Sequence, residues 1–370
     1  MDFTLDEQQT DVRDLARGLI ARRTAGEPAG APEGSAWFDS HLWRDLAQAG
    51  LIGIAVPETH GGSGAGFVEQ CLLVEEVARA AARVPIIEAV VLAALPISVF
   101  GTEEQRQRLV APFCSGDLLL GSAIRTEPVR TRSVTAELVD DAWQLTGEIS
   151  HVPLADVAER VLVEAVAGDD RRGWFLLDPR GAGVTVTLQS SVDRAARWHL
   201  SLTSAGVVSA DVLLAPEAGV TDLERWLDAH GVASRCIAAA GSSDAALRMT
   251  AAHVTEREQF GRPVGTFQAV AHRVADAYID ATGVRLTAWR AAWLLAQDEP
   301  TAEALAVAAW WATDAPTRIG DAAMHLHGGL SVDLDYPLHR HYLALRQIEL
   351  ALGGSARRLA LLGDQVALAS

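Results

Sequence analysis

The feature that most limits the fold of this chain is a hydrophobic period that changes twice along its 370 residues. Up to about residue 117, apolar side chains recur at the spacing of a helix. From Leu118 to about Leu214, short runs rich in Val, Leu and Thr alternate with Gly, Pro and Asp, which is typical of strands and turns. Past Pro216 the helical spacing returns. We therefore predict an α+β chain with an N-terminal all-helical domain (1–117), a central antiparallel β-domain (118–215) and a C-terminal helical domain (216–370).

Caps and breaks in the periodicity locate the helices more closely. Thr102 stands before two glutamates and is predicted to cap a helix over Glu103–Pro112, whose first turn favours acidic residues. In the last domain, Gly, Pro and polar residues separate long stretches of helical spacing. These stretches predict helices over 221–230, 234–257, 264–295, 301–327 and 338–368.

The charge of the chain limits its partners. Aspartate and glutamate number 48 against 31 basic residues, which gives a formal net charge of -17 at pH 7. A protein this acidic is a poor ligand for nucleic acid or an anionic membrane, so neither is an expected partner. Every basic residue is Arg, and the absence of Lys excludes a Schiff-base lysine and a P-loop lysine.

The cysteines and the apolar stretches indicate the compartment. Cys71, Cys114 and Cys236 are odd in number and far apart, which fits reduced thiols better than a disulfide framework or a zinc site. The first residues are acidic and contain no apolar signal-peptide core. The apolar run from Val84 to Phe100 is interrupted by prolines and is too short to span a bilayer. We expect a cytoplasmic protein.

Three motifs follow one another along this pattern. A Gly-rich turn over 50–66, GLIGIAVPETHGGSGAG, lies between predicted helices and lacks the strand-loop-helix order of a phosphate-binding loop. The segment REQFGRPVGTFQ occupies 257–268, and HGGLSVDLDYP occupies 327–337. With the domain order, these motifs resemble those of acyl-CoA dehydrogenases along nearly the whole chain. The resemblance implies a C-terminal four-helix bundle and the FAD-dependent α,β-dehydrogenation of an acyl-CoA thioester.

The resemblance assigns several retained residues to a cofactor site that is shared between chains. In the family, the segment that matches 257–268 reaches across a subunit interface to the FAD of a neighbouring chain. The positions of this chain that match such contacts are Arg257 (FAD phosphates), Phe260 and Gln268 (adenosine end), His325 (commonly Gln in the family), Gly328 and Gly329.

The catalytic base of the family, by contrast, has no counterpart at its usual positions. The reaction needs a carboxylate that removes the α-proton. The usual glutamate position, counted from the Tyr-Pro proline, is Leu352, and the alternative position, before an arginine that matches Arg235, is Ser234. Neither side chain is an adequate base. Glu349, about one helical turn before Leu352, is a substitute candidate, although a structural carboxylate is the more ordinary interpretation.

The flavin contacts that the family makes within one chain are also incomplete. Thr126, in the stretch TEP, is retained and by resemblance lies along the flavin ring. The next family element, Gly-x-Gly-Ser-Asp, is replaced by VRTRS over 129–133, and the tryptophan-containing wall is replaced by His151 and Pro153. Proline has no N–H to donate and no hydroxyl. The sequence keeps residues that serve a neighbour's cofactor and loses residues that would hold its own.

This asymmetry favours one subunit of a hetero-oligomer. The chain resembles the non-catalytic partner subunit of actinobacterial acyl-CoA dehydrogenases, which form α2β2 tetramers and act on bulky acyl groups, sterol side chains included. The resemblance implies as partners an acyl-CoA thioester, a second chain with the Glu base, and an electron-transfer acceptor protein. Three alternatives stay open: a homotetramer with a relocated base such as Glu349, a flavin oxidase or oxygenase on the same fold, and a non-enzymatic stabilising subunit.

Overall fold

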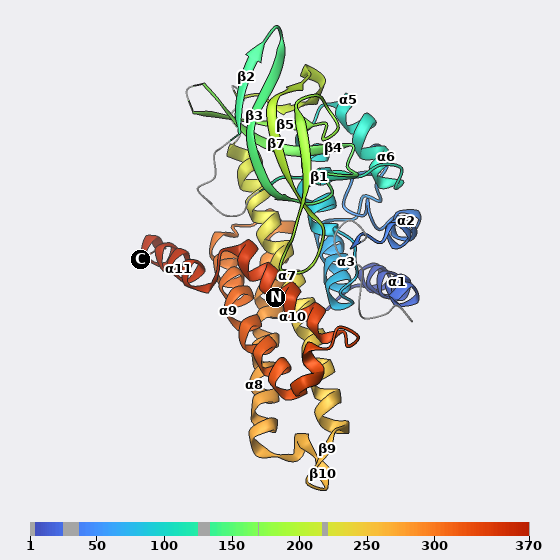
Figure 1. Ribbon diagram of the computed structural model, residues 1–370, viewed down its shortest axis with the longest axis vertical. Coiled ribbons are helices and arrows are strands. Elements are labelled where there is room, and N and C mark those ends of the chain that lie inside the picture. Colours follow the sequence, from blue (N-terminus) through green and yellow to red (C-terminus); the bar gives the residue numbers. More distant parts are fainter. Residues whose placement is uncertain (1–3, 25–36, 125–133, 169, 217–220, 370) are drawn as a thin grey trace. The chain divides into compact units, whose positions relative to one another are not determined.

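The chain forms two compact units in the computed structural model, which describes residues 4–24, 37–124, 134–168, 170–216 and 221–369. The first unit combines the start of the chain with Cys71–Ala82 and with the residues from Val232 onward. The second unit contains the segment that ends at Gln70 and the residues from Arg83 to Gly231. Helices, then strands, then helices follow one another along the chain, which confirms the predicted fold class (Figure 1). The domain boundaries after residues 117 and 215 stay a prediction.

Helices precede the sheet in the sequence. They are α1 (Glu7–Thr24), α2 (Ser40–Gln48), α3 (Phe67–Arg79), α4 (Leu95–Phe100), α5 (Glu103–Gln105) and α6 (Ala111–Cys114), with π-helical turns at Ile87–Ala94 and Arg106–Val110. Thr102 caps α5 as predicted, because its hydroxyl accepts from the Gln105 amide at 3.2 Å while the Gln105 side chain accepts from the Thr102 amide at 3.0 Å. The Gln105 side chain also donates to the carbonyls of Ala210 and Val212, so the cap fastens the helix to the edge of the sheet.

One eight-stranded sheet forms the centre of the second unit. Its strands are β1 (Leu120–Ser122), β2 (Thr135–Val139), β3 (Ala142–Val152), β4 (Arg160–Ala167), β5 (Arg171–Leu177), β6 (Val184–Gln189), β7 (Arg197–Val207) and β8 (Val212–Leu214). They lie in the order β6-β7-β3-β2-β4-β5-β8, with β1 paired to β4, and are drawn in green in Figure 1. Leu145 pairs with Ala205 and Ile149 with Leu200 across β3 and β7, and these buried side chains contribute to the core.

The predicted antiparallel sheet is in fact mixed. β1 and β2 each pair in parallel with β4, whereas the other pairings are antiparallel. A parallel pair needs a long crossover, and β3 supplies it between β2 and β4. The hairpin into β3 turns through Asp140 and Asp141, whose φ angles of 47° and 62° are those of a type I′ turn. Short apolar runs reveal strands but not their direction, which is why the sequence did not predict the parallel pairs.

Long helices make up most of the first unit. They are α7 (Thr221–Glu256, which begins in the second unit), α8 (Gln268–Ala296), α9 (Ala302–His327), α10 (Leu338–Leu352) and α11 (Ser355–Ala369). Small side chains from α7, α8, α9 and α10 share one core, which contains Ala246, Ala277, Ala281, Ile319, Ala323 and Leu338. Gly283 permits the close approach of α8 and α9, since a Cβ there would meet the Trp311 ring at 2.7 Å. None of the described helices is long and apolar enough to cross a membrane.

Two predicted helix boundaries in this region were wrong. α7 runs through Gly231 without a break, because the buried side chains around Val232, Cys236 and Ile237 outweigh the modest helix penalty of glycine. The predicted helix 338–368 is instead divided into α10 and α11 at Gly353 and Gly354, whose φ angles are 90° and 81°. Two successive residues in the left-handed region end a helix, and glycine adopts that region without strain.

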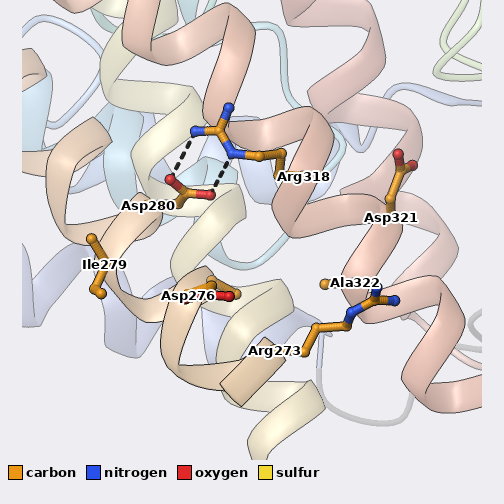
Figure 2. Close-up of a pocket in the computed structure, with 8 residues that line it drawn as sticks. Arg273, Asp276, Ile279, Asp280, Arg318, Asp321 and Ala322 are labelled. Carbon is orange, nitrogen blue, oxygen red and sulfur yellow. Dashed lines mark hydrogen bonds and ion pairs between the residues drawn. The ribbon is translucent and has the colours of Figure 1, made fainter. Parts of the chain in front are cut away.

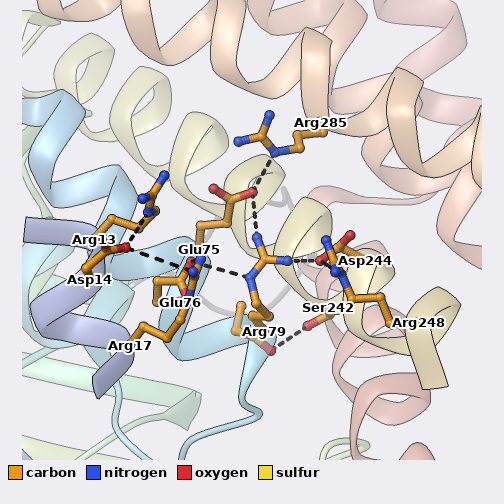
Figure 3. Close-up of polar contacts among 11 residues, drawn as sticks. Arg13, Asp14, Arg17, Glu75, Glu76, Arg79, Ser242, Asp244, Arg248 and Arg285 are labelled. Atoms are coloured by element: carbon orange, nitrogen blue, oxygen red, sulfur yellow. Dashed lines mark hydrogen bonds and ion pairs between the residues drawn. The ribbon is translucent and has the colours of Figure 1, made fainter. Parts of the chain in front are cut away.

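Buried acids of α3 hold the first unit together. Glu75 and Glu76 are almost fully buried, and each is paired with arginines from other parts of the chain (Figure 3). Arg17 of α1 donates to both oxygens of Glu76 at 3.0 and 2.9 Å, which raises the pKa of this guanidinium. Arg285 of α8 contacts Glu75 at 3.0 Å, and Arg79 contacts both glutamates and Asp244 of α7. Both buried acids of α3 therefore meet opposite charges.

Candidate functional site

The segment Arg257–Gln268, called the arm below, projects as a hairpin between α7 and α8 (Figure 1). Its strands β9 (Glu258–Gln259) and β10 (Arg262–Pro263) pair in antiparallel fashion. The two-residue turn between them has φ angles of 55° at Phe260 and 76° at Gly261. A type I′ turn requires both values, and a phenylalanine in the left-handed region is strained. The Phe260 ring is 93% exposed, and its edge contact with Phe267 has ring centroids 6.2 Å apart.

Arg257 presents an unpaired cation at the base of the arm. Its amide donates to the carbonyl of His253 at 2.8 Å, and its carbonyl accepts from the amide of Val264 at 2.8 Å, so the backbone is fixed at both groups. Its side chain is exposed, and within the described part of the chain no hydrogen bond or ion pair holds the guanidinium. In a protein of net charge -17, such a group is available for an external anion.

Gln268 and its neighbours complete the arm. The side chain of Gln268, the first residue of α8, is exposed. The preceding Phe267 is covered by the guanidinium of Arg262, whose central carbon lies 4.1 Å from the ring centroid. This cation–π contact stiffens the return of the hairpin into α8.

The end of α9 forms a second exposed element. α9 ends at His327, and Gly328 follows with φ 58° and ψ -135°, a conformation that side chains other than glycine rarely adopt. The Ser331 hydroxyl donates to the Gly328 carbonyl at 2.6 Å and fixes the turn. Nothing lies within 4 Å of the position that a Cβ would take on Gly328 or Gly329. These glycines and the exposed His325 therefore leave open backbone that a ligand can approach closely.

The two predicted base positions are closed. Leu352 is the last residue of α10 and is 0% exposed, and the Arg358 side chain donates to its carbonyl. Ser234 of α7 is also 0% exposed, and its hydroxyl has no hydrogen-bond partner among the described residues. Neither position carries an acid. These two sites therefore lack a group that can take a proton from carbon.

Glu349, the substitute candidate, is held in a structural ion pair. Its carboxylate accepts from Arg346 at 2.8 Å and from the Thr317 hydroxyl at 3.2 Å. Hydrogen bonds to Tyr342 and Glu349 raise the pKa of the Arg346 guanidinium. The arrangement ties α10 to α9 through the pairing of Glu349 with Arg346 and Thr317.

The positions that would form a flavin wall within this chain are only partly described. Thr126 lies outside the described residues, as does the stretch 129–133. His151 has a φ of 60°, its amide donates to the side chain of Gln189 at 2.8 Å, and its ring is exposed. Pro153 is buried. At these two positions the chain offers no planar side chain packed into a wall and no hydroxyl.

Comparison with known proteins identifies the family. The model of the acyl-CoA dehydrogenase N-terminal domain matches residues 6–117, and that of the C-terminal domain matches residues 229–367. The chain belongs to the acyl-CoA dehydrogenase family. It is 36% identical to acyl-CoA dehydrogenase FadE27 of Mycobacterium tuberculosis, with 99% of each chain covered, and 29% identical to FadE28 of the same organism, with 100% of each covered.

Solved structures give the same result. A chain of the ChsE4-ChsE5 complex from Mycobacterium tuberculosis is similar with a TM-score of 0.90 and 36% identity, and 99% of each chain is covered. A chain of the Tcur3481-Tcur3483 steroid ACAD G363A variant is similar with a TM-score of 0.87 and 35% identity over 99% of each chain. Butyryl-CoA dehydrogenase from Megasphaera elsdenii, at 23% identity and a TM-score of 0.89, shares the acyl-CoA dehydrogenase fold.

FAD is the cofactor of the acyl-CoA dehydrogenase family, as the resemblance predicted. The exposed elements of this chain fit such a group, because the arm offers a free guanidinium and an exposed aromatic ring, and the Gly328–Gly329 turn offers open backbone. A pyrophosphate needs a cation or N–H donors, and an adenine needs an apolar surface.

A pocket of about 520 Å³ lies between α8 and α9, near both exposed elements in the sequence (Figure 2). Its lining includes Arg273 and Asp276 of α8 and Asp321 of α9. Arg318 donates to both oxygens of Asp280 at 2.8 Å, and this pairing raises the pKa of the guanidinium. Because charged side chains of both signs line the pocket, it fits a polar ligand group better than an apolar acyl chain.

Three residues near the arm were missed by sequence reasoning. The rings of His253 and His327 stack with centroids 4.4 Å apart, and His327 also contacts the Tyr336 hydroxyl. The sequence did place both histidines beside predicted site residues, because His253 stands four residues before Arg257 and His327 directly precedes Gly328. Two of the three cysteines are held as thiols, because burial raises the pKa of Cys114 to about 11 and of Cys236 to about 12.

Proposed function

We propose that this chain is one subunit of a heteromeric, FAD-dependent acyl-CoA dehydrogenase, that it binds the FAD of a partner subunit in trans, and that it lacks a catalytic base of its own. The observation that carries the proposal is the contrast between two sets of positions. Arg257 and Phe260 are exposed, and no hydrogen bond or ion pair holds the Arg257 guanidinium among the described residues, whereas Leu352 and Ser234 are buried and neither is an acid.

The reaction defines what each chain must supply. An acyl-CoA thioester loses a proton from its α-carbon to a carboxylate and a hydride from its β-carbon, and a double bond forms between the two. FAD, when bound, accepts that hydride. The partner subunit would supply the carboxylate, and this chain would supply Arg257 to the phosphates, Phe260 and Gln268 to the adenosine end, and His325, Gly328 and Gly329 beside them.

The relatives support the assembly and the substrate class. Two of the similar structures, the ChsE4-ChsE5 complex and the Tcur3481-Tcur3483 variant, are named as pairs of chains, and the second is named a steroid ACAD. We therefore favour an α2β2 tetramer and a bulky, steroid-like acyl group. A relative at 26% identity is named a subunit of a caffeyl-CoA reductase-Etf complex, which supports an electron-transfer flavoprotein as the acceptor.

Flavin stoichiometry tests the proposal. The chain is purified alone and after co-expression with an acyl-CoA dehydrogenase chain that carries glutamate at the position matching Leu352, and FAD per chain is measured by absorbance. We expect little FAD on the chain alone and a yellow, active complex after co-expression. A homo-oligomer with one FAD per chain and acyl-CoA turnover would overturn the proposal.

One variant separates this role from that of a merely stabilising subunit. Arg257→Ala in the complex should lower FAD occupancy, whereas Arg225→Ala, which removes an exposed arginine near the start of α7, should not. If Arg257→Ala leaves FAD occupancy unchanged, the chain acts as a scaffold and makes no contact in trans.

A further inference from the structure

The two exposed elements of the proposed FAD contact come from the ends of different helices. The arm begins where α7 ends, and the Gly328–Gly329 turn begins where α9 ends. Helix ends fray unless other contacts hold them. Both elements can serve one cofactor only if something fixes their relative placement, and a group of three side chains, His253, His327 and Tyr336, lies where the two helix ends meet.

His327 is satisfied at both ring nitrogens. Its Nδ1 lies 2.8 Å from the carbonyl of Ala323, and because a carbonyl only accepts, Nδ1 carries the proton. Its Nε2 lies 3.1 Å from the Tyr336 hydroxyl and, in the neutral ring, accepts the phenolic proton. The ring is 5% exposed, and burial lowers the pKa of His327, which keeps it neutral. Burial and the nearby Glu256 raise the pKa of Tyr336, so its hydroxyl keeps the proton that it donates.

The group connects to both exposed elements through short covalent and hydrogen-bonded paths. His327 directly precedes Gly328, and its ring orientation sets where the turn departs from α9. The His253 ring stacks on that of His327 with an interplanar angle of 20°, and the His253 carbonyl accepts from the Arg257 amide. Tyr336, at the far end of the turn, packs against the common core of the helix bundle.

We propose that His327, held by Tyr336 and Ala323 and stacked on His253, is a positioning residue that fixes the Arg257 arm relative to the Gly328–Gly329 turn, so that both contact the same FAD. The inference rests on the proposed trans contact. It goes beyond that function, because it assigns a role to three residues that touch no cofactor themselves.

A double-mutant cycle tests the inference. Tyr336→Phe removes one hydroxyl and leaves Nε2 of His327 without its donor. FAD affinity of the co-expressed complex is measured by flavin fluorescence for Tyr336→Phe, Arg257→Ala and the double variant, with thermal unfolding recorded for each. Tyr278→Phe, the same chemical change at an exposed tyrosine of α8, is the matched control.

We expect Tyr336→Phe to weaken FAD binding roughly fivefold, the usual effect of one lost hydrogen bond. In the Arg257→Ala background it should have much less effect, because positioning an absent guanidinium gains nothing. His253→Leu, which removes the stack at a half-buried position, should show the same coupling and replaces Tyr336→Phe should that variant fail to fold.

The outcomes separate this inference from the proposed function. Equal effects of Tyr336→Phe in both backgrounds would mean general stabilisation and would overturn the positioning role. No effect of Tyr336→Phe on FAD affinity, with a strong effect of Arg257→Ala, would overturn the inference and leave the proposed function intact. No effect of Arg257→Ala would overturn both.

Discussion

The arm and the interior of the first unit treat charged groups in opposite ways. In the interior, Glu75 and Glu76 are each paired with arginines, and the base positions Leu352 and Ser234 carry no charge. On the arm, Arg257 is unpaired and Phe260 is 93% exposed. A folded chain satisfies its own groups where it can. The difference therefore teaches where the chain is complete by itself and where it depends on another molecule.

The contrast between the interior and the arm would be wrong if the paired interior charges could lose a partner without a loss of stability. Arg79→Met removes the cation shared by Glu75, Glu76 and Asp244 and should lower the free energy of unfolding by about 1.5–3 kcal/mol, because each buried glutamate loses one of its two arginine partners. Arg225→Met breaks an exposed pair with Asp222 and should change it by less than about 1 kcal/mol. Urea unfolding measures both, and equal effects would show that the network is not a stabilising one.

A glutamate placed at position 352 provides the second test of how the interior tolerates charge. Leu352→Glu returns the family's residue to its usual position but buries a carboxyl that has no partner, so we expect a loss of roughly 3–4 kcal/mol at pH 7 and no dehydrogenase activity of the chain alone. Leu350 of the same helix is 58% exposed, so Leu350→Glu should hardly change the free energy of unfolding. A stable, active Leu352→Glu variant would show that only the base is missing.

A buried histidine of α10, His341, predicts that the stability of the fold depends on pH. Burial lowers the pKa of His341 to about 4, and its Nδ1 has no hydrogen-bond partner among the described residues. The unfolded chain takes up this proton near pH 6.5 and the folded chain only near pH 4, so stability is complete above pH 6.5 and declines as the pH falls. The expected loss reaches roughly 3 kcal/mol at pH 4.

Thermal unfolding across this pH range checks the assignment. His341→Leu should flatten the decline between pH 6.5 and pH 4, whereas His272→Leu, at an exposed position of α8, should leave the slope unchanged. The same slope in wild type and His341→Leu would assign the decline to other groups.

Arg257→Ala provides the corresponding test of the arm. A charge-assisted hydrogen bond is worth about 1.5–3 kcal/mol, so FAD affinity of the co-expressed complex should fall roughly 10- to 100-fold. Because no hydrogen bond or ion pair holds the guanidinium within the part of the chain that the structure describes, the thermal stability of the chain alone should not change. A large loss of stability would mean that the side chain serves the fold.

The smallest effect is expected at Glu349. Glu349→Gln replaces a carboxylate that is paired with Arg346, and the glutamine can still accept from Thr317. The turnover of the complex should stay within about twofold of wild type, and stability should fall by about 1 kcal/mol or less. Collapse of turnover with stability retained would identify Glu349 as the base and favour a homotetramer.

The sequence predicted the parts of the fold that are local. Helical spacing, the Thr102 cap and the strand runs depend on neighbouring residues, and the structure confirms them. The continuity of α7 through Gly231, the break at Gly353–Gly354 and the parallel pairing with β4 depend on burial and on distant strands, which a single sequence does not display.

The candidate site divides in the same way. The arm was found because its residues are contiguous, and the matched turn was found through HGG. The stack of His253 on His327 joins residues that are far apart in the sequence, so only coordinates bring it to light. The pairing of Glu349 with Arg346 was likewise not predicted from the spacing, and whether Glu349 acts as a base stays open to the Glu349→Gln test.

The strained turn at Phe260 has a consequence for the supply of this chain in a cell. An exposed aromatic ring at the tip of a projecting hairpin leaves apolar surface in water that a second copy of the chain can cover. The net charge of -17 opposes such association by repulsion, and salt weakens that protection. The solubility of the chain should therefore depend on ionic strength. It should also depend on whether the chain and the molecule that covers the hairpin are made in matching amounts.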